Sequence, residues 1–375
     1  MSRSGPSGDR VTPMARWRGW LAAVLLVGLS VAVYRHRADA ALALRDVAAM
    51  STAWKLTLLA LTAGGIATSG LAVRTVTPGL SISNAVMVHQ ATTAANNAVI
   101  GSGPVNLGLR VAMLRSWGVS GPAIALTVVA LNVVAAYKTW LVTLVVAVLG
   151  LSGSARGVID HRIFVVAAIV AVAVIVGSTT WWWMVLTFPV LSGWIARRCQ
   201  RLTHRVRRRV PRLPPVDIPS VTESLRHEAR RLVRHCGSKI VTATTLEQVL
   251  FVLTPVAVVR AVGIDASVIS TAEVIIAFGL VRLAAALTPI PGGIGITEIA
   301  LVTLLIRFGG PEPAVVAAVL TYRSITFLLP LATGGACLAV WRWRGRQQTS
   351  SPLATVPPEA LVRARRPDAV VEPAG

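Results

Sequence analysis

The sequence contains little acid and little charge of either sign. Its 375 residues include 15 Asp and Glu against 37 Lys and Arg, and charged residues make up only 14% of the chain. Hydrophobic residues make up 54%, and the mean hydropathy is +0.68. A chain of this length with so few charges is too apolar for a soluble globular protein. Because backbone groups in hydrocarbon must be hydrogen-bonded internally, we expect an all-α polytopic membrane protein.

The sequence also has few cysteines and no recognisable nucleotide-binding motif. The three cysteines, Cys199, Cys236 and Cys337, have no close spacing, which excludes a disulfide framework and a zinc site. No phosphate-binding loop for a nucleotide is present, so any transport must draw on ion gradients, the membrane potential or lipid mass action. We find no catalytic motif, and we expect no enzymatic activity, no cofactor and no metal.

The basic residues are concentrated in loops and tails. The formal net charge is +22 and the isoelectric point is about 11.7, which is also typical of nucleic-acid-binding proteins. Basic residues beside apolar spans instead record topology, so we expect anionic membrane lipids as partners and no nucleic acid. Residues 197–212 hold eight arginines, and no acid occurs between Asp160 and Asp217. The positive-inside rule places this linker in the cytoplasm, where it could also dock an envelope-synthesis protein.

Apolar runs divide the chain into two membrane halves. They cover 19–34, 53–73, 122–149 and 162–188 in the first half, and 238–259, 268–287, 294–309 and 313–341 in the second. We therefore expect a multi-pass protein of the cell membrane with both termini in the cytoplasm. The predicted segments are a basic tail at 1–18, a first half at 19–188, a basic linker at 189–237, a second half at 238–341 and a disordered tail at 342–375.

The linker contains one helical pattern. Ser220 followed by Glu223 is a capping-box pattern, and Leu225, Ala229, Leu232 and Val233 then recur at helical spacing among arginines. The pattern is typical of an amphipathic helix on the inner leaflet, and equally of a solvated linker helix.

Parity of crossing predicts a re-entrant segment. If tails and linker share one side, each half crosses an even number of times, so the polar stretch 81–117 should enter and leave by one face. Residues 268–309 form either a hairpin or two spans, which gives six to eight crossings in all.

Residues 117–132 (WGVSGPAIALTVVALN) match 308–323 (FGGPEPAVVAAVLTYR) at an offset of 191. These patterns indicate an inverted repeat, the architecture of many transporters.

The stretch 288–298, TPIPGGIGITE, interrupts the second half. Pro289 and Pro291 lack the amide donor, and Gly292, Gly293 and Gly295 permit conformations that other residues avoid. The helix therefore breaks here. Irregular backbone at membrane depth lies within protein or lines a cavity, so this break is a candidate transport site.

Charges inside the apolar runs are the candidate site residues. Arg323 lies near the bilayer midplane, and Glu298 follows the glycine turn where a helix dipole favours a carboxylate. They form either a structural ion pair or a substrate contact. The glycine turn could hold a lipid phosphate, with Arg323, Arg282 or Arg110 nearby. Glu247 and Glu273 also lie within apolar runs and could carry protons, although a lone acid near the end of a span is more often interfacial. His89 receives no role.

The second half resembles a known family. PIPGGIGITEIALVTLLIRFGGPEPAVVAAVLTYRSITFLLP is similar to the C-terminal motif of the lysylphosphatidylglycerol synthase transmembrane, flippase-like family. NNAVIGSGPVNLGLRVAMLRSWGVS is similar to its first-half motif, so the resemblance covers 19–341. It implies a lipid translocase without the cytosolic transferase domain. The substrate-binding candidates from the motifs and from the charges together are Pro291, Gly292, Gly293, Gly295, Glu298, Tyr322, Arg323, Arg282, Arg110 and Asn97.

Three functions compete. The first is a flippase or transporter for a phospholipid or a polyprenyl-phosphate-linked lipid. The second is a membrane glycosyltransferase, which would need acids on an aqueous loop, where the best available are Asp39 and Asp46. The third is a non-transporting scaffold of an envelope-synthesis complex.

Overall fold

Regular secondary structure is entirely helical in the part of the chain that the structure describes. This computed structural model describes residues 45, 48–77, 79–99, 103–155, 157–188, 193–194, 196–198, 200–201, 218–287, 293 and 295–350. Five of its helical segments are long and apolar enough to cross a membrane. The expected all-α polytopic membrane fold is therefore confirmed. The segments are α3 (Thr52–Val76), α6 (Gly121–Leu151), α7 (His161–Thr187), α9 (Ile218–Ala261) and the continuous run of α12 (Glu312–Arg323), η2 (Ser324–Leu328) and α13 (Leu329–Ser350).

The polar stretch 81–117 folds as a helical hairpin. Its helices α4 (Ile82–Ala98) and α5 (Gly103–Ser116) have 17 and 14 residues. At about 1.5 Å per residue they are about 26 Å and about 21 Å long, shorter than the roughly 30 Å of a hydrocarbon core. The hairpin begins where α3 ends and ends where α6 begins. These two helix ends are joined by a hydrogen bond between the hydroxyls of Thr77 and Thr127, 3.0 Å apart. The hairpin therefore enters and leaves at one end of the bundle.

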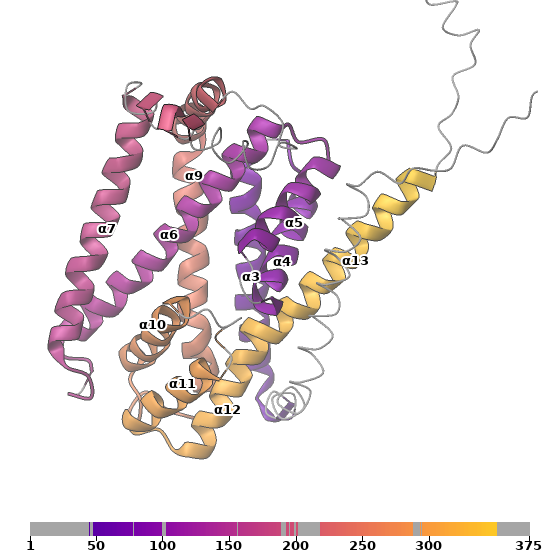
Figure 1. Ribbon diagram of the computed structural model, residues 1–375. Coiled ribbons are helices and arrows are strands. Elements are labelled where there is room, and N and C mark those ends of the chain that lie inside the picture. Colours follow the sequence, from indigo (N-terminus) through magenta and orange to yellow (C-terminus); the bar gives the residue numbers. More distant parts are fainter. Residues whose placement is uncertain are drawn as a thin grey trace, which may run out of the picture.

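Residues 268–309 form a second hairpin, not two spans. Its helices α10 (Thr271–Leu287) and α11 (Ile296–Arg307) have 17 and 12 residues, again too few to cross. The loop between α9 and α10 is held by Arg260, which donates to the carbonyls of Ile264 and Ile269 at 2.8 and 2.9 Å. α10, α11 and α12 gather at the lower end of Figure 1, opposite the end where α3 meets α6.

The two halves repeat the same order of elements in opposite directions. A crossing helix (α3 or α9) is followed by a hairpin (α4–α5 or α10–α11) and then by another crossing (α6 or α12–α13). The starts of α6 and α12, Gly121 and Glu312, are 191 positions apart, which is 312 minus 121. This is the offset of the sequence match. Because the hairpins open at opposite ends, the repeat is inverted.

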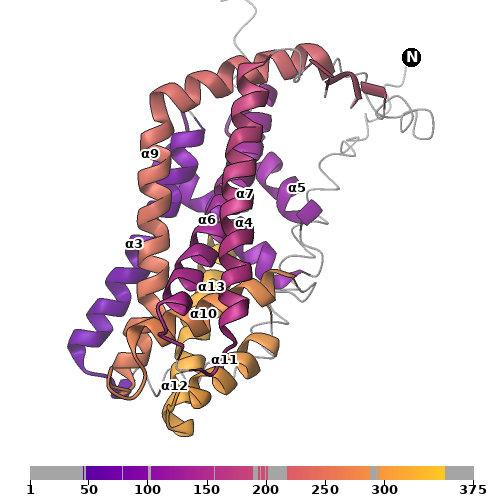
Figure 2. The same cartoon turned by 90° about the vertical axis from the view of Figure 1, so that its left-hand side faces the viewer.

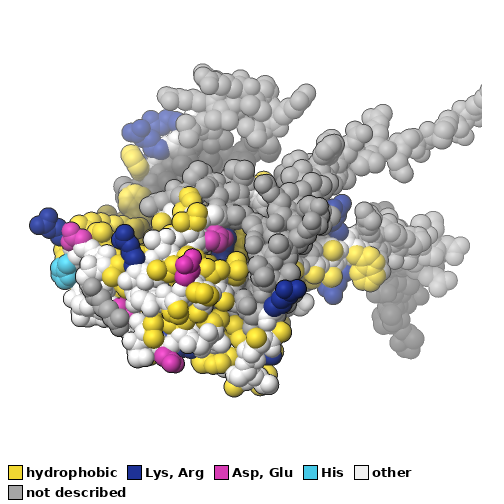
Figure 3. Space-filling model, turned by 90° about the horizontal axis from the view of Figure 1, so that it is seen from below, with side chains coloured by type: hydrophobic (Ala, Val, Ile, Leu, Met, Phe, Trp, Pro, Cys, Tyr) yellow, Lys and Arg dark blue, Asp and Glu magenta, His cyan; other side chains and the backbone are white. Residues whose placement is uncertain are grey.

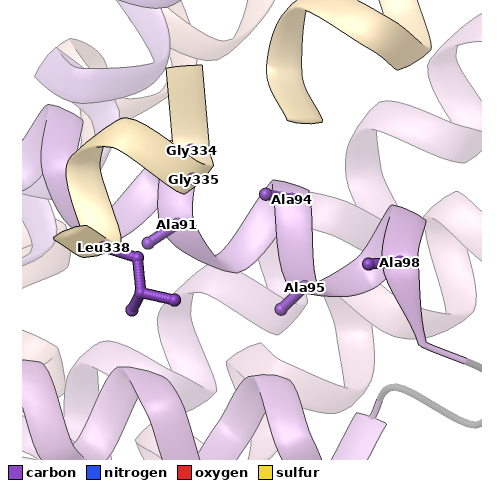
Figure 4. A pocket seen from close by; sticks show the side chains of 7 residues that line it. All are labelled: Ala91, Ala94, Ala95, Ala98, Gly334, Gly335 and Leu338. Atoms are coloured by element: carbon purple, nitrogen blue, oxygen red, sulfur yellow. The ribbon is translucent and has the colours of Figure 1, made fainter. Parts of the chain in front are cut away.

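Each hairpin has its own apolar core. One cluster packs α4 and α5 against the ends of α3 and α13, and the other packs α10, α11 and α12 against α6 and α9. In the first cluster α13 approaches α4 very closely, because Gly334 and Gly335 face the small side chains of Ala91 and Ala94 (Figure 4). A Cβ added at Gly334 would collide with the carbonyl oxygen of Gln90. Small residues thus hold the first hairpin against the second half.

α9 bends between the linker and the membrane half. In Figure 2 its first part runs across one end of the bundle and the rest descends into it. The stripe containing Leu225, Ala229 and Leu232 packs on Val76 of α3 and Leu126 of α6. Leu225, Ala229 and Leu232 therefore contact other helices of the protein, whereas Val233, the fourth residue of the predicted stripe, is exposed.

The two ends of the bundle differ in their charged residues. Three exposed acids, Asp160, Asp265 and Glu312, lie at the α10–α12 end. Exposed arginines lie there as well, and Figure 3 shows acidic and basic side chains scattered among apolar ones. The opposite end carries exposed arginines of α3, α5, the first part of α9 and the last turns of α13. α13 continues to Ser350, so helix occupies the start of the tail that the composition predicts to be disordered.

Candidate functional site

A glycine turn positions Glu298 at the start of α11. Gly293 and Gly295 have φ of 64° and 84°, the left-handed region that side-chained residues avoid. Gly295 is the N-cap residue, and its amide donates to Glu298 Oε2 at 2.6 Å, as in a capping box. The turn therefore positions this carboxylate at the start of α11, where the helix dipole favours a negative charge. Pro291 and Gly292 lie outside the described residues.

Arg323 at the end of α12 pairs with this carboxylate. Its Nε donates to Glu298 Oε1 at 2.6 Å, and the two side chains are 13% and 27% exposed. The guanidinium carbon lies 4.9 Å from the ring centre of Phe327, within cation–π range. Arg323 Nη2 is buried and has no hydrogen-bond partner in the described part of the chain. The arginine thus keeps one donor group available beside its ion pair.

A π-helical turn follows Arg323 directly. η2 covers Ser324–Leu328. It is followed closely by Pro330, which has no amide hydrogen to donate. Single π-helical turns inside α-helices often mark functional sites. Here the turn directs Ile325 and Thr326 into a cavity of about 190 Å³ in the middle of the bundle. One continuous helix therefore contributes both to the ion pair and to the wall of the cavity.

The cavity lies between the two halves of the repeat. α3 and α4 line it from the first half, and α9, η2 and α13 line it from the second. Its polar groups include Ser69, His89, Thr93, Glu247 and Thr326. A polar cavity shared by two inverted repeats is where transporters of this architecture bind substrate.

A second ion pair lies at this cavity. Lys138 Nζ of α6 is 2.6 Å from Glu247 Oε2, with 16% and 13% of the side chains exposed. Ser69 Oγ donates to Glu247 Oε1 at 2.7 Å. Glu247 is thus not interfacial, as its place in the sequence suggested, but buried and paired. A lysine inside the apolar run 122–149 was the sequence signal for this pair, because a charge there needs a partner.

Arg282 connects the cavity to the second hairpin. Its guanidinium carbon lies 4.1 Å from the ring centre of Phe251, which lines the cavity. It is close enough to interact electrostatically with Tyr322 and Glu247. Tyr322 packs edge-on against Phe278, with ring centres 4.6 Å apart. Tyr322 interacts electrostatically with both Arg282 and Arg323, and Arg323 is paired with Glu298, so contacts or electrostatic interactions link these four candidates. None of them is among the residues that line the cavity.

The first-half candidates lie apart from this group. Arg110 is on α5, is half-buried, and its Nε has no partner among the described residues. It interacts electrostatically with His89 of the cavity. No hydrogen bond or ion pair joins Asn97 of α4 to Glu298 or Arg323 within the described chain. The described residues also hold no group of three His, Cys, Asp or Glu arranged for a metal ion.

Comparison with protein families finds a match over most of the chain. The family described as lysylphosphatidylglycerol synthase TM region matches residues 19–334. Comparison with curated proteins finds no match. The matched range includes both hairpins, the two ion pairs and the central cavity.

Proposed function

We propose that this chain, which belongs to the lysylphosphatidylglycerol synthase TM region family, translocates an anionic lipid across the membrane. The lipid is a phospholipid or a polyprenyl-phosphate-linked lipid, bound through its phosphate. No catalytic step is involved, and the protein acts on the cell membrane as a transporter.

The observation that carries the proposal is an excess of buried positive charge. Among the described residues, four half-buried cations lie in the interior of the bundle, against two half-buried carboxylates and the buried carboxylate of Glu273, which Ser270 holds at the start of α10. Buried charges are costly unless they are balanced, so the excess favours an anion as the missing partner. A phosphate fits, because a guanidinium donates two parallel hydrogen bonds to it. The cations are Arg110, Lys138, Arg282 and Arg323, and the half-buried carboxylates are Glu247 and Glu298.

The inverted hairpins supply the path. The α4–α5 hairpin opens at one end of the bundle and the α10–α11 hairpin at the other, with the cavity between them. Movement of one hairpin against the other half would expose the cavity to each side in turn. We propose that Arg323 takes the phosphate when the cavity is open and returns to Glu298 when it is empty.

The charge of the two ends supports an orientation. The positive-inside rule favours the arginine-rich end, with the first part of α9 and the end of α13, in the cytoplasm. The α4–α5 hairpin would then open to the cytoplasm, and the α10–α11 hairpin to the outside.

Purified protein in liposomes tests the proposal. The measurement is the rate at which labelled phosphatidylglycerol, polyprenyl phosphate and net-neutral phosphatidylcholine cross the bilayer. We expect the wild type to move an anionic lipid faster than phosphatidylcholine. Arg323→Lys keeps the charge but loses the planar fork, so it should fold normally and move the lipid at least about tenfold more slowly.

The matched control is Arg307→Lys, an exposed arginine at the end of α11. It should transport at the wild-type rate. Equal rates for wild type and Arg323→Lys would place phosphate binding elsewhere. Equal rates for all three lipids, or no movement at all, would refute the transport of anionic lipid.

A further inference from the structure

The Lys138–Glu247 pair does not take part in the phosphate site, and its position is unusual. Lys138 is the eighteenth of 31 residues in α6, and Glu247 lies fourteen residues before the end of α9. Fourteen residues correspond to about 21 Å, deep within a hydrocarbon core of roughly 30 Å. Ionisable residues at this depth are rare and mark ion or proton pathways.

Glu247 faces a space that can hold water. The cavity of about 190 Å³ would accommodate on the order of six water molecules at about 30 Å³ each. Its wall offers hydroxyl, imidazole and carboxylate groups from Ser69, His89, Thr93 and Glu247, which give such water its hydrogen-bond partners. Lys138 approaches the carboxylate but is not among the residues that line the cavity.

The helices around the cavity bring several charged and polar groups near Glu247 or its neighbours. α4 brings His89, α6 brings Lys138, and α5 brings Arg110, which interacts with His89. On the other side, α10 brings Arg282, which interacts with Glu247, and α12 brings Tyr322 and Arg323. α3 contributes the hydroxyl of Ser69, and η2 and α13 contribute Thr326 and Pro330. Glu247 is thus the acid of a cavity otherwise surrounded by neutral and basic groups.

We propose that this cavity is a proton-exchange site that couples lipid movement to a proton gradient, an inference that rests on the proposed transport function. A proton from cavity water binds Glu247, with His89 beside it as the exchanging base. The carboxylate becomes a neutral carboxylic acid, and the ammonium of Lys138 loses its counter-charge. The interior therefore gains one unit of positive charge.

This added charge links proton binding to lipid binding. The extra cation attracts an anionic headgroup, so the protonated protein binds the lipid more tightly. By thermodynamic reciprocity, a bound anion also favours protonation of Glu247. Lipid and proton would then cross in the same direction, and a gradient of one would drive the other.

The first test measures protonation without transport. Infrared difference spectroscopy of the purified protein, recorded as pH is lowered, detects the carbonyl stretch of a protonated carboxyl. We expect a band that titrates in the wild type and is absent from Glu247→Gln. The matched control is Glu273→Gln, which removes a buried carboxylate held by the Ser270 amide and hydroxyl, outside the cavity. Persistence of the titrating band in Glu247→Gln, or its loss only in Glu273→Gln, would overturn the assignment.

The second test measures coupling in liposomes of phosphatidylglycerol and phosphatidylcholine. A pH gradient of about one unit should change the rate of anionic lipid movement by about fivefold or more, the lower range of typical coupling between sites. This ratio should fall to one in Glu247→Gln. Lys138→Met combined with Glu247→Gln removes both charges of the pair, so neither partner is left without the other. It should give the same ratio if the single variant does not fold.

The outcomes separate the two proposals. If lipid moves at the same rate with and without the gradient, proton coupling is wrong and transport stands. If no lipid moves but the infrared band titrates and depends on Glu247, the proton site stands and the transport function is wrong. An unchanged gradient ratio in the double variant contradicts a role for this pair.

Discussion

The Glu298–Arg323 pair supports a quantitative prediction by double-mutant cycle. The perturbations are Glu298→Gln, Arg323→Met and both together. Removing one partner of a fully buried pair costs about 3–5 kcal/mol, because the other charge is left unpaired. The two side chains are 27% and 13% exposed, so water compensates part of this cost. We expect about 2–3 kcal/mol for each single variant.

Glutamine is chosen at position 298 because it isolates the charge. Glu298 also accepts the Gly295 amide at 2.6 Å, and the amide oxygen of glutamine can still accept that hydrogen bond. Glu298→Ala loses this cap as well and should cost about 1 kcal/mol more. The double variant leaves no unpaired charge, so its cost should be less than the sum of the two single variants.

The assay is reversible unfolding in detergent micelles, followed by circular dichroism. The coupling free energy should lie between about 1 and 2 kcal/mol, within the range for residues in direct contact. Additive effects, with a coupling below about 0.5 kcal/mol, would show that the pair is not formed in the folded protein. The proposed exchange of Arg323 between Glu298 and the lipid phosphate would then be wrong, because Arg323 would have no ion-pair partner in the empty state.

Two further predictions concern packing and orientation. Gly334→Ala places a Cβ against the Gln90 carbonyl and should destabilise the protein by about 1–3 kcal/mol. The control Gly177→Ala on α7, where a Cβ meets nothing within 4 Å, should not destabilise it. Equal unfolding midpoints for the two variants would refute the close contact of α4 with α13. Ser220→Cys on the first part of α9 should resist a membrane-impermeant thiol reagent added to intact cells, and Ser267→Cys in the α9–α10 loop should react with it. The reverse pattern would invert the proposed orientation.

Much of the architecture was accessible from the sequence because it follows from local rules. Proline and glycine between 288 and 298 predict a broken helix whatever its neighbours are, and the polar residues of 81–117 disfavour a crossing. The position of glycine and proline in both halves also predicted the repeat at an offset of 191. The helix break and the polar stretch depend only on residues close together in the chain, and the repeat required only a comparison of two such local patterns. Hence they predicted the first hairpin and the Glu298–Arg323 site.

The pairing of distant charges required the tertiary structure. Lys138, Glu247 and Ser69 lie in three helices, and only their packing shows that Glu247 is buried beside a cavity rather than placed at an interface. The same holds for the second hairpin, since parity permitted either a hairpin or two spans at 268–309. An even number of crossings satisfies topology in both cases, and the choice depends on which apolar faces α10 and α11 bury against α6, α9 and α12. Local composition determined where the chain can cross a membrane, whereas contacts between helices far apart in sequence decided which charges meet inside it.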